Sequence, residues 1–254
     1  MSCPPRPVFL VIPCFRESQR LPPFLDMLGE ELDPLRGQVC ILTVDDGSGE
    51  PESAALVEAV EKRRRRWPQL ILPVLQAPHQ GKGGAILHGW RQAPPDTAHF
   101  AFVDADGAVP ASEVRRLIGL ASSSDNAEEV WFATRRNTAT TRVQRDFHRR
   151  ITGGIYALLV NLLLGTRVRD PACGFKIIPR SLYVNCAGHL REFGWALDLE
   201  LLARIHRHGY SIRQEPVTWS EKAGSRLVPG DSWRIFRALL RVRQESRSWR
   251  NNTA

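Results

Sequence analysis

Long apolar runs and paired cysteines are what this sequence lacks. Its longest nearly apolar stretch, residues 155–164, is about half the roughly 20 residues that a membrane-spanning helix needs, so we expect a core helix or one that touches a membrane face. The five cysteines are odd in number and show no CxxC spacing, which argues against a disulfide framework and a structural zinc site. The run 8–12 ends at Pro13 and follows a proline-rich start with one arginine, so we expect no signal peptide. These absences favour a protein located in the reducing cytoplasm.

Acidic residues are also in deficit. The 254 residues include 35 Lys and Arg against 27 Asp and Glu, a formal net charge of +8, and such a surface attracts phosphates, nucleic acid or anionic lipid. A nucleic-acid-binding protein is one hypothesis, but the chain has no recognisable RNA or DNA module and no stacking platform of aromatic and basic residues. We therefore expect no nucleic-acid partner. With 43% hydrophobic and 24% charged residues, the composition excludes disorder and fibrous repeats.

The order of apolar runs predicts an α/β fold. Strand-like runs alternate with helix-like segments in the first half, which indicates a single, mainly parallel sheet flanked by helices. The second half predicts a long helix, a short strand, a further helix and a last strand. The expected strands are 8–12, 39–44, 70–75, 100–103, 130–134, 174–178 and 210–217, and the later helices are 142–164 and 197–208.

Asp104 and Asp106 carry the clearest chemistry. Two carboxylates one residue apart at a strand end, followed by Gly107, can approach one hard divalent cation, and oxygen ligands suit Mg²⁺ or Mn²⁺. Alternatively, one aspartate caps the next helix and the other is a solvated turn residue.

Two further polar segments follow predicted strands. The segment 44–48 (VDDGS) offers acceptors for a base or a ribose hydroxyl, although Asp-Gly-Ser also forms an ordinary Asx turn. The segment 81–85 (GKGGA) places Lys82 and open backbone NH groups where a helix begins, which is a natural anion site. Its spacing fits neither a Walker A loop nor GxGxxG.

Together with residues 11–17 (VIPCFRE), these segments resemble the family-2 glycosyltransferases of the GT-A fold. The resemblance continues through 169–176 (RDPACGFK), 195–202 (WALDLELL) and 219–227 (WSEKAGSRL), and spans about residues 8–241. The set is similar to the branch that glycosylates polyprenyl phosphates, and within it to the dolichyl-phosphate glucosyltransferases. Two departures stand out. Arg16 replaces the usual Asn, and eukaryotic relatives carry an N-terminal membrane anchor, whereas here we expect the first strand to begin almost at once and membrane attachment to come from elsewhere.

The resemblance implies roles for particular residues. It places Asp104 and Asp106 on the metal and diphosphate, with Asp106 catalytic, and Asp170 beside the sugar as a second catalytic residue. Pro13, Phe15, Glu17, Asp45 and Lys82 would complete the nucleotide-sugar site. Basic residues for an acceptor phosphate would be Arg135, Arg149, Lys176 and Arg226, and Asp198 and Glu200 would bind sugar hydroxyls or form a polar stripe on an apolar helix.

The C-terminal segment 231–250 interleaves six arginines with Trp233, Phe236, Leu240 and Trp249. This pattern is typical of a basic amphipathic helix on an anionic membrane, or of a solvated helix packed by its apolar stripe. We expect one domain over 1–254, with about 8–135 binding the nucleotide sugar, about 136–230 binding the acceptor, and 231–254 as the basic helix and tail.

The resulting hypothesis is an inverting, metal-dependent hexosyltransferase. It would move glucose from UDP-glucose to a polyprenyl phosphate while attached peripherally to the cytoplasmic face of a membrane. Another nucleotide sugar, such as GDP-mannose, or a soluble acceptor is the alternative within the fold. Oligomeric state is not predicted.

Overall fold

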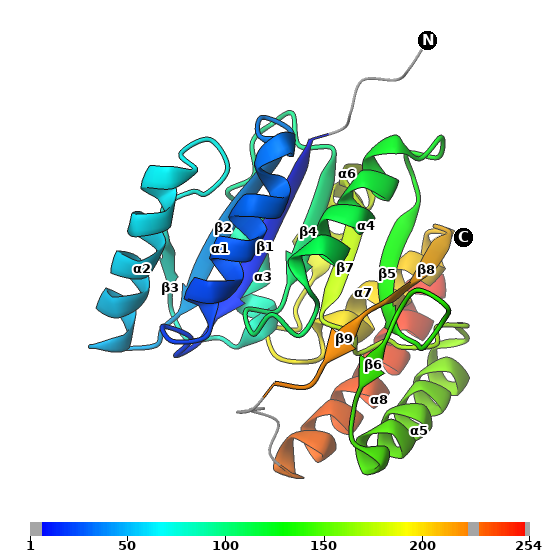
Figure 1. Ribbon diagram of the computed structural model, residues 1–254. Coiled ribbons are helices and arrows are strands. Elements are labelled where there is room, and N and C mark those ends of the chain that lie inside the picture. The colour runs from blue at the N-terminus through cyan, green and yellow to red at the C-terminus, as the bar shows by residue number, and fades with distance from the viewer. Residues whose placement is uncertain (1–6, 223–228, 252–254) are drawn as a thin grey trace.

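Strands from both halves of the chain share one sheet in the computed structural model, which describes residues 7–222 and 229–251 (Figure 1). The sheet has seven strands in the order β3-β2-β1-β4-β7-β5-β8. β7 runs antiparallel to both of its neighbours, whereas the other pairings are parallel. The strands are β1 (Val8–Cys14), β2 (Val39–Asp46), β3 (Leu75–Ala77), β4 (His99–Val103), β5 (Val130–Arg135), β7 (Phe175–Pro179) and β8 (Ile212–Val217).

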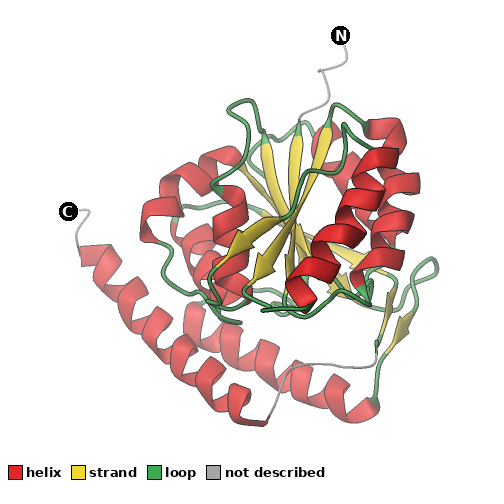
Figure 2. Ribbon diagram, turned by 90° about the vertical axis from the view of Figure 1, so that its left-hand side faces the viewer, coloured by secondary structure: helices red, strands yellow, loops and turns green. Residues whose placement is uncertain are grey.

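Helices cover both faces of this sheet, so its central strands are apolar on both sides. In β1, Leu10 and Ile12 belong to one core cluster and Phe9 and Val11 to the other, as the two-residue period of a strand requires. One face packs against α1 (Leu21–Leu32), α2 (Glu52–Arg66) and α4 (Ala111–Ser123), and the other face packs mainly against α3 (Lys82–Trp90), α6 (Arg180–Cys186) and α7 (Leu197–Arg207) (Figures 1 and 2).

Two predicted elements differ from the structure. The third strand lies at Leu75–Ala77 and not at 70–75, because Pro73 has no N–H to donate to a ladder and Ile71 forms only an isolated bridge with Ile41. The long helix begins at Phe147 and not at 142. The residues before it form β6 (Val143–Gln144), which pairs with β9 (Trp219–Ser220) in a small second sheet.

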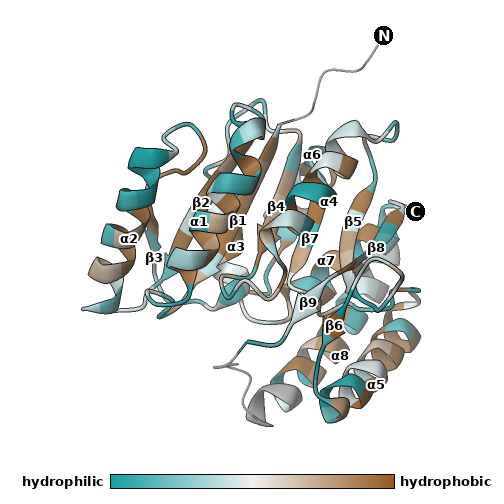
Figure 3. Cartoon of the chain, in the orientation of Figure 1, coloured by the Kyte–Doolittle hydropathy of each residue, from teal (hydrophilic) through white to brown (hydrophobic). Residues whose placement is uncertain are grey.

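The last helices lie together below the carboxyl ends of the strands. α5 (Phe147–Leu164) runs beside α8 (Pro229–Asn251), and both contact α7 (Figures 1 and 2). α5 buries only Ala157, Val160 and Leu164, and much of its remaining surface is apolar (Figure 3). Among the described helices, none combines the length and the hydropathy that crossing a membrane requires.

Candidate active site

A cavity of about 1030 Å³ opens at the carboxyl edge of the sheet, between the strand ends and helices α5 and α8. This is the edge at which open α/β sheets bind their ligands. One part, the carboxylate end, is lined by Pro13, Phe15, Glu17, Asp46, His79, Lys82, Asp104 and Asp106. The other part, the arginine end, is lined by Arg135, Arg145, Arg149, Asp170 and Glu221.

Asp104 and Asp106 follow β4 directly and both line the carboxylate end. Lys82, the first residue of α3, places its Nζ 2.6 Å from an Asp104 carboxylate oxygen. Gly174 lies against the same carboxylate, since a Cβ there would stand 1.8 Å from Asp104 Oδ2. The backbone N–H of Asp104 also donates to the Gly174 carbonyl at 3.0 Å. The start of α3 and the loop before β7 therefore fix Asp104.

The electrostatics of this pair suit a divalent cation. Burial raises the pKa of Asp106, and the neighbouring Asp104 carboxylate raises it further. Burial acts to lower the pKa of Lys82, but the carboxylates of Asp104 and Asp198 outweigh it and raise that pKa overall. No group of three or more His, Cys, Asp or Glu side chains suited to a metal occurs among the described residues. If two carboxylates bound Mg²⁺ or Mn²⁺, phosphate oxygens and water would fill the remaining coordination positions.

An aromatic pair forms the far wall of the carboxylate end. The rings of Phe15 and His79 stack with centroids 4.4 Å apart. Asp46 accepts hydrogen bonds from the backbone N–H groups of Gln80 and Gly81, both at 2.8 Å, and so holds the loop that carries His79. A flat apolar surface beside carboxylate acceptors is suited to a nucleobase and its ribose.

Asp45, which we predicted in the nucleotide site, lies behind the cavity wall. It is fully buried and is absent from the cavity wall. Its carboxylate accepts hydrogen bonds from the hydroxyls of Ser48 and Ser53, and Ser48 in turn accepts the backbone N–H of Arg16 at 2.7 Å. Asp45 thus supports the loop after β1, and its neighbour Asp46 is the carboxylate that lines the cavity.

Arg135 and Asp170 form a buried bidentate pair at the arginine end. The guanidinium donates to both carboxylate oxygens at 2.6 Å, and the Arg135 backbone N–H adds a third bond at 3.0 Å. Burial alone would raise the pKa of Asp170, but the bonds and charge of Arg135 lower it overall. Asp170 therefore stays ionised and is a poor general base.

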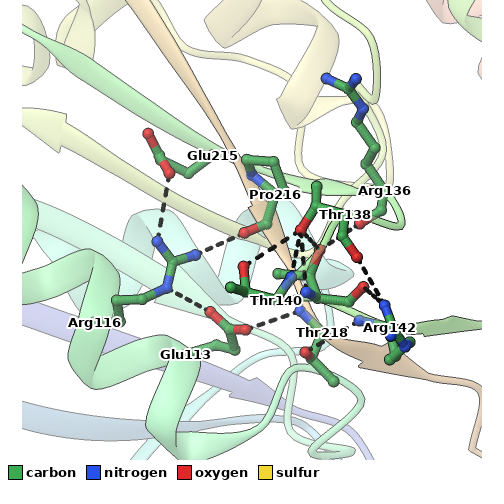
Figure 4. Close-up of polar contacts among 10 residues, drawn as sticks. Glu113, Arg116, Arg136, Thr138, Thr140, Arg142, Glu215, Pro216 and Thr218 are labelled. Carbon is green, nitrogen blue, oxygen red and sulfur yellow. Dashed lines mark hydrogen bonds and ion pairs between the residues drawn. The ribbon is translucent and has the colours of Figure 1, made fainter.

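Arg149 on α5 forms an ion pair with Glu221 at 2.8 Å. Glu221 follows β9, and its backbone N–H bonds to the Gln144 carbonyl at 3.0 Å. The strand leading to it is braced by Glu113 of α4, which accepts from Arg116 at 2.7 Å and from the Thr218 backbone N–H at 3.0 Å (Figure 4). The parallel pairing of β6 with β9 thus brings residues far apart in sequence to one wall.

Four other predicted residues fall in different places. Lys176 is fully buried in β7 and pairs with Asp198 at 2.8 Å, so a phosphate has no direct access to it. Asp198 does reach the cavity wall. Glu200 is buried behind it and accepts the backbone N–H groups of Arg191 and Glu192 at 2.8 and 2.9 Å. Arg226 lies outside the described residues.

Sequence reasoning missed several lining residues. Asp46 lies in the segment 44–48 noted above, but its neighbour Asp45 is the residue that the resemblance assigns to the nucleotide-sugar site. Arg145 lies inside the helix that the sequence predicts over 142–164, and this prediction misses the pairing of β6 with β9 that brings it to the cavity. Trp195 lines the wall as well and begins the segment 195–202 noted above, whereas no spacing in the sequence indicates His79 or Tyr156.

The strand order and the carboxylate pair after β4 define the class as a nucleotide-sugar transferase fold of the GT-A type. One solved structure with this fold is glucosyl-3-phosphoglycerate synthase from Mycobacterium tuberculosis in complex with Mn²⁺, UDP and glucosyl-3-phosphoglycerate; its TM-score is 0.63 at 17% identity, and the match covers 93% of this chain and 80% of that one. Another is the mannosyltransferase PcManGT from Pyrobaculum calidifontis in complex with GDP-Man and Mn²⁺; its TM-score is 0.62 at 18% identity, and the match covers 98% of this chain and 76% of that one.

The family follows from the sequence itself. The model of glycosyl transferase family 2 matches residues 9–185, so the chain belongs to that family and is a glycosyltransferase, as predicted. The dolichyl-phosphate beta-glucosyltransferase of Mus musculus is 29% identical over 97% of this chain and 78% of its own length.

Proposed function

We propose that the protein transfers glucose from UDP-glucose to a polyprenyl phosphate, with inversion at the sugar carbon. The observation that carries the proposal is the cavity itself, which has paired carboxylates at one end and three arginines at the other. Its rim is apolar, with Ile155 and Leu159 of α5 facing Phe236 and Leu239 of α8. A diphosphate, a phosphate monoester and a lipid chain each match one of these three surfaces. The mouse relative supports glucose and dolichyl phosphate through its name.

The donor would occupy the carboxylate end. Phe15 and His79 would contact the base, Asp46 and Glu17 would accept from sugar or base donors, and Lys82 would bind the diphosphate. Asp104 and Asp106 would hold Mg²⁺ or Mn²⁺, which stabilises the charge that develops on a departing diphosphate. Asp198, on the cavity wall, would bind hydroxyls of the transferred sugar.

The acceptor phosphate would occupy the arginine end. A phosphate monoester has its second pKa near 6, so at neutral pH it is largely a dianion and needs no strong base. One of its oxygens forms the new bond to the sugar carbon, while the bond to the diphosphate breaks and UDP leaves with the electron pair. Arg135 and Arg149 would hold the phosphate in line for this attack by charge-assisted hydrogen bonds.

The lipid acceptor implies a membrane surface, and α5 is the surface that we propose meets it, at the cytoplasmic face. Its exposed apolar residues recur every three or four positions, as on one side of a helix. They are Phe147, Ile151, Ile155, Leu158 and Leu162. The predicted C-terminal helix contributes less, because Leu239 and Val242 of α8 are buried, whereas Trp233 and Leu240 remain exposed.

A transfer assay tests the proposal. The purified protein is given UDP-glucose, UDP-galactose or GDP-mannose with a polyprenyl phosphate or a soluble phosphate monoester, with Mg²⁺ or with a chelator. We expect a glucosylated lipid phosphate by mass spectrometry, formed only with the metal. Transfer from GDP-mannose alone, or only to the soluble acceptor, would contradict the proposed donor or acceptor.

A further inference from the structure

Arg145 is an arginine of the cavity wall to which the proposed function has so far given no task. It lies between β6 and the start of α5, and it is half-buried. Its guanidinium rests against Gly153, one and a half turns into α5 by helix geometry. A Cβ at Gly153 would stand 2.8 Å from Arg145 Nη2 and 2.9 Å from Nη1. The missing side chain therefore lets the Nη edge of the guanidinium approach the helix, and both residues line the cavity.

The other two arginines of this wall already have carboxylate partners. Arg135 is bound by Asp170 at 2.6 Å, and Arg149 by Glu221 at 2.8 Å. Arg145 forms no ion pair or hydrogen bond with any residue in the described part of the chain. Of the three guanidinium groups at this end, two therefore have a carboxylate partner and that of Arg145 does not.

The charges around Arg145 favour the binding of an anion. The pKa of Arg145 is lowered, first by burial and next by the charge of Arg135, while Asp170 and Glu221 act to raise it and Arg149 adds a smaller lowering effect. A guanidinium desolvated beside two others is stabilised when an anion arrives. A phosphate can accept two hydrogen bonds from one guanidinium in parallel.

We propose that Arg145, supported by Gly153, is the residue that binds a phosphate monoester dianion in the arginine end of the cavity. The inference rests on the proposed function, in which that monoester is the acceptor. Arg135 and Arg149 keep their carboxylate partners and would hold the phosphate through their remaining N–H groups. Arg145 adds the charge that no carboxylate offsets, and this charge distinguishes a phosphate from the corresponding alcohol.

Binding can be measured without turnover. Farnesyl phosphate, glycerol 3-phosphate and farnesol are titrated into wild-type protein and into Arg145→Gln by calorimetry. We expect wild type to bind farnesyl phosphate at least about tenfold more tightly than Arg145→Gln does, since a hydrogen bond to a charged group is lost. Arg145→Lys should recover part of the affinity, and farnesol should not distinguish the proteins.

Helix α5 offers a matched pair of variants. Gly153→Ala places a methyl group where the guanidinium rests, whereas Gly154→Ala meets no atom within 4 Å. Both changes raise helix propensity by about 1 kcal/mol, so both variants should fold. Gly153→Ala should weaken farnesyl phosphate binding about threefold or more, and Gly154→Ala should leave it unchanged.

The outcomes separate this inference from the proposed function. Three results would overturn the role of Arg145. Wild type and Arg145→Gln could bind farnesyl phosphate equally, wild type could fail to bind it, or the two alanine variants could have equal effects. If glycerol 3-phosphate binds as tightly as farnesyl phosphate and depends on Arg145 to the same extent, the anion site at Arg145 is supported and the proposal of a lipid acceptor is contradicted. In the transfer assay, Arg145→Gln should raise KM for the acceptor and leave KM for UDP-glucose within about twofold.

Discussion

The carboxylate end and the arginine end of the cavity are built on different supports. Asp104 follows β4 and Asp46 ends β2, and their carboxylates are held by Lys82 and by backbone N–H groups. The arginine end depends on the short parallel pair of β6 and β9 and on α5, whose outer face is exposed. Under the proposed function, the first end would fix the geometry of the donor, and the exposed end would leave room for a long acceptor that arrives from a membrane surface.

The largest expected effect is at the carboxylate end. Asp106→Asn should lower metal-dependent turnover about 100- to 1000-fold, because it removes one charged ligand from the site that stabilises the leaving group. The fold should persist, since an amide oxygen can still accept the Ala108 N–H that Asp106 accepts at 3.0 Å.

The same substitution, Asp106→Asn, should not lower the stability of the metal-free protein, although it lowers turnover. The raised pKa of Asp106 means that its ionised form disfavours the folded state at neutral pH. Asp106→Asn should therefore melt at or above the wild-type Tm in a chelator, while the exposed control Asp125→Asn should alter neither turnover nor Tm. Normal turnover in Asp106→Asn would refute the metal assignment.

At the arginine end, Arg135→Met should cost about 3 kcal/mol of the free energy of unfolding, because it leaves the Asp170 carboxylate buried without a partner. Urea unfolding measures the loss. The next residue supplies the control, since the Arg136 side chain is exposed and points away from the polar network in Figure 4. An equal effect of Arg136→Ala would show that the ion pair is not what stabilises this wall.

The same pair predicts a pH dependence. Because the pKa of Asp170 is lowered in the folded protein, its ionised form contributes stability above the unfolded value of about 3.9, and the contribution is lost as the pH falls through the lowered value. Wild type should exceed Asp170→Asn by about 2 kcal/mol at pH 7, and the gap should narrow only below about pH 4. A gap that narrows between pH 5 and 7 would contradict this assignment.

The smallest expected effect concerns the exposed face of α5. Leu158→Gln should reduce binding to anionic lipid vesicles about fivefold, with little change in stability, since an interfacial helix buries such a side chain only in part. Val184→Gln is the matched control, because Val184 is 61% exposed against 58% for Leu158 and lies on α6, at the opposite end of the sheet in Figure 1. Equal vesicle binding by both variants would exclude α5 as the docking surface.

The contrast between the two ends also explains what the sequence could predict. Strand period and the short polar motifs after β1, β3 and β4 are enough to predict that Glu17, Lys82 and Asp104 lie at one edge, because the carboxyl ends of parallel strands meet there. The arginine end depends on β6 pairing with β9, a contact between segments about 75 residues apart that local periodicity does not record.

Lys176 shows the complementary limit. Its basic character suggested a phosphate ligand, but it stands between Phe175 and Ile177 in a strand that is apolar on both faces. Such a position indicates a buried ion pair, and Asp198 is its partner at 2.8 Å. The segment 169–176 contributes Asp170 and Ala172 to the cavity wall, but the sequence does not show which of its side chains face the cavity.

One crystal structure would test the two-ended cavity most directly. Crystals grown with Mn²⁺, UDP and farnesyl phosphate should show manganese about 2.1 Å from carboxylate oxygens of Asp104 and Asp106, UDP beside Phe15, and the prenyl phosphate hydrogen-bonded to Arg145. Manganese bound away from both aspartates, or both phosphate ligands bound at the same end, would contradict the account.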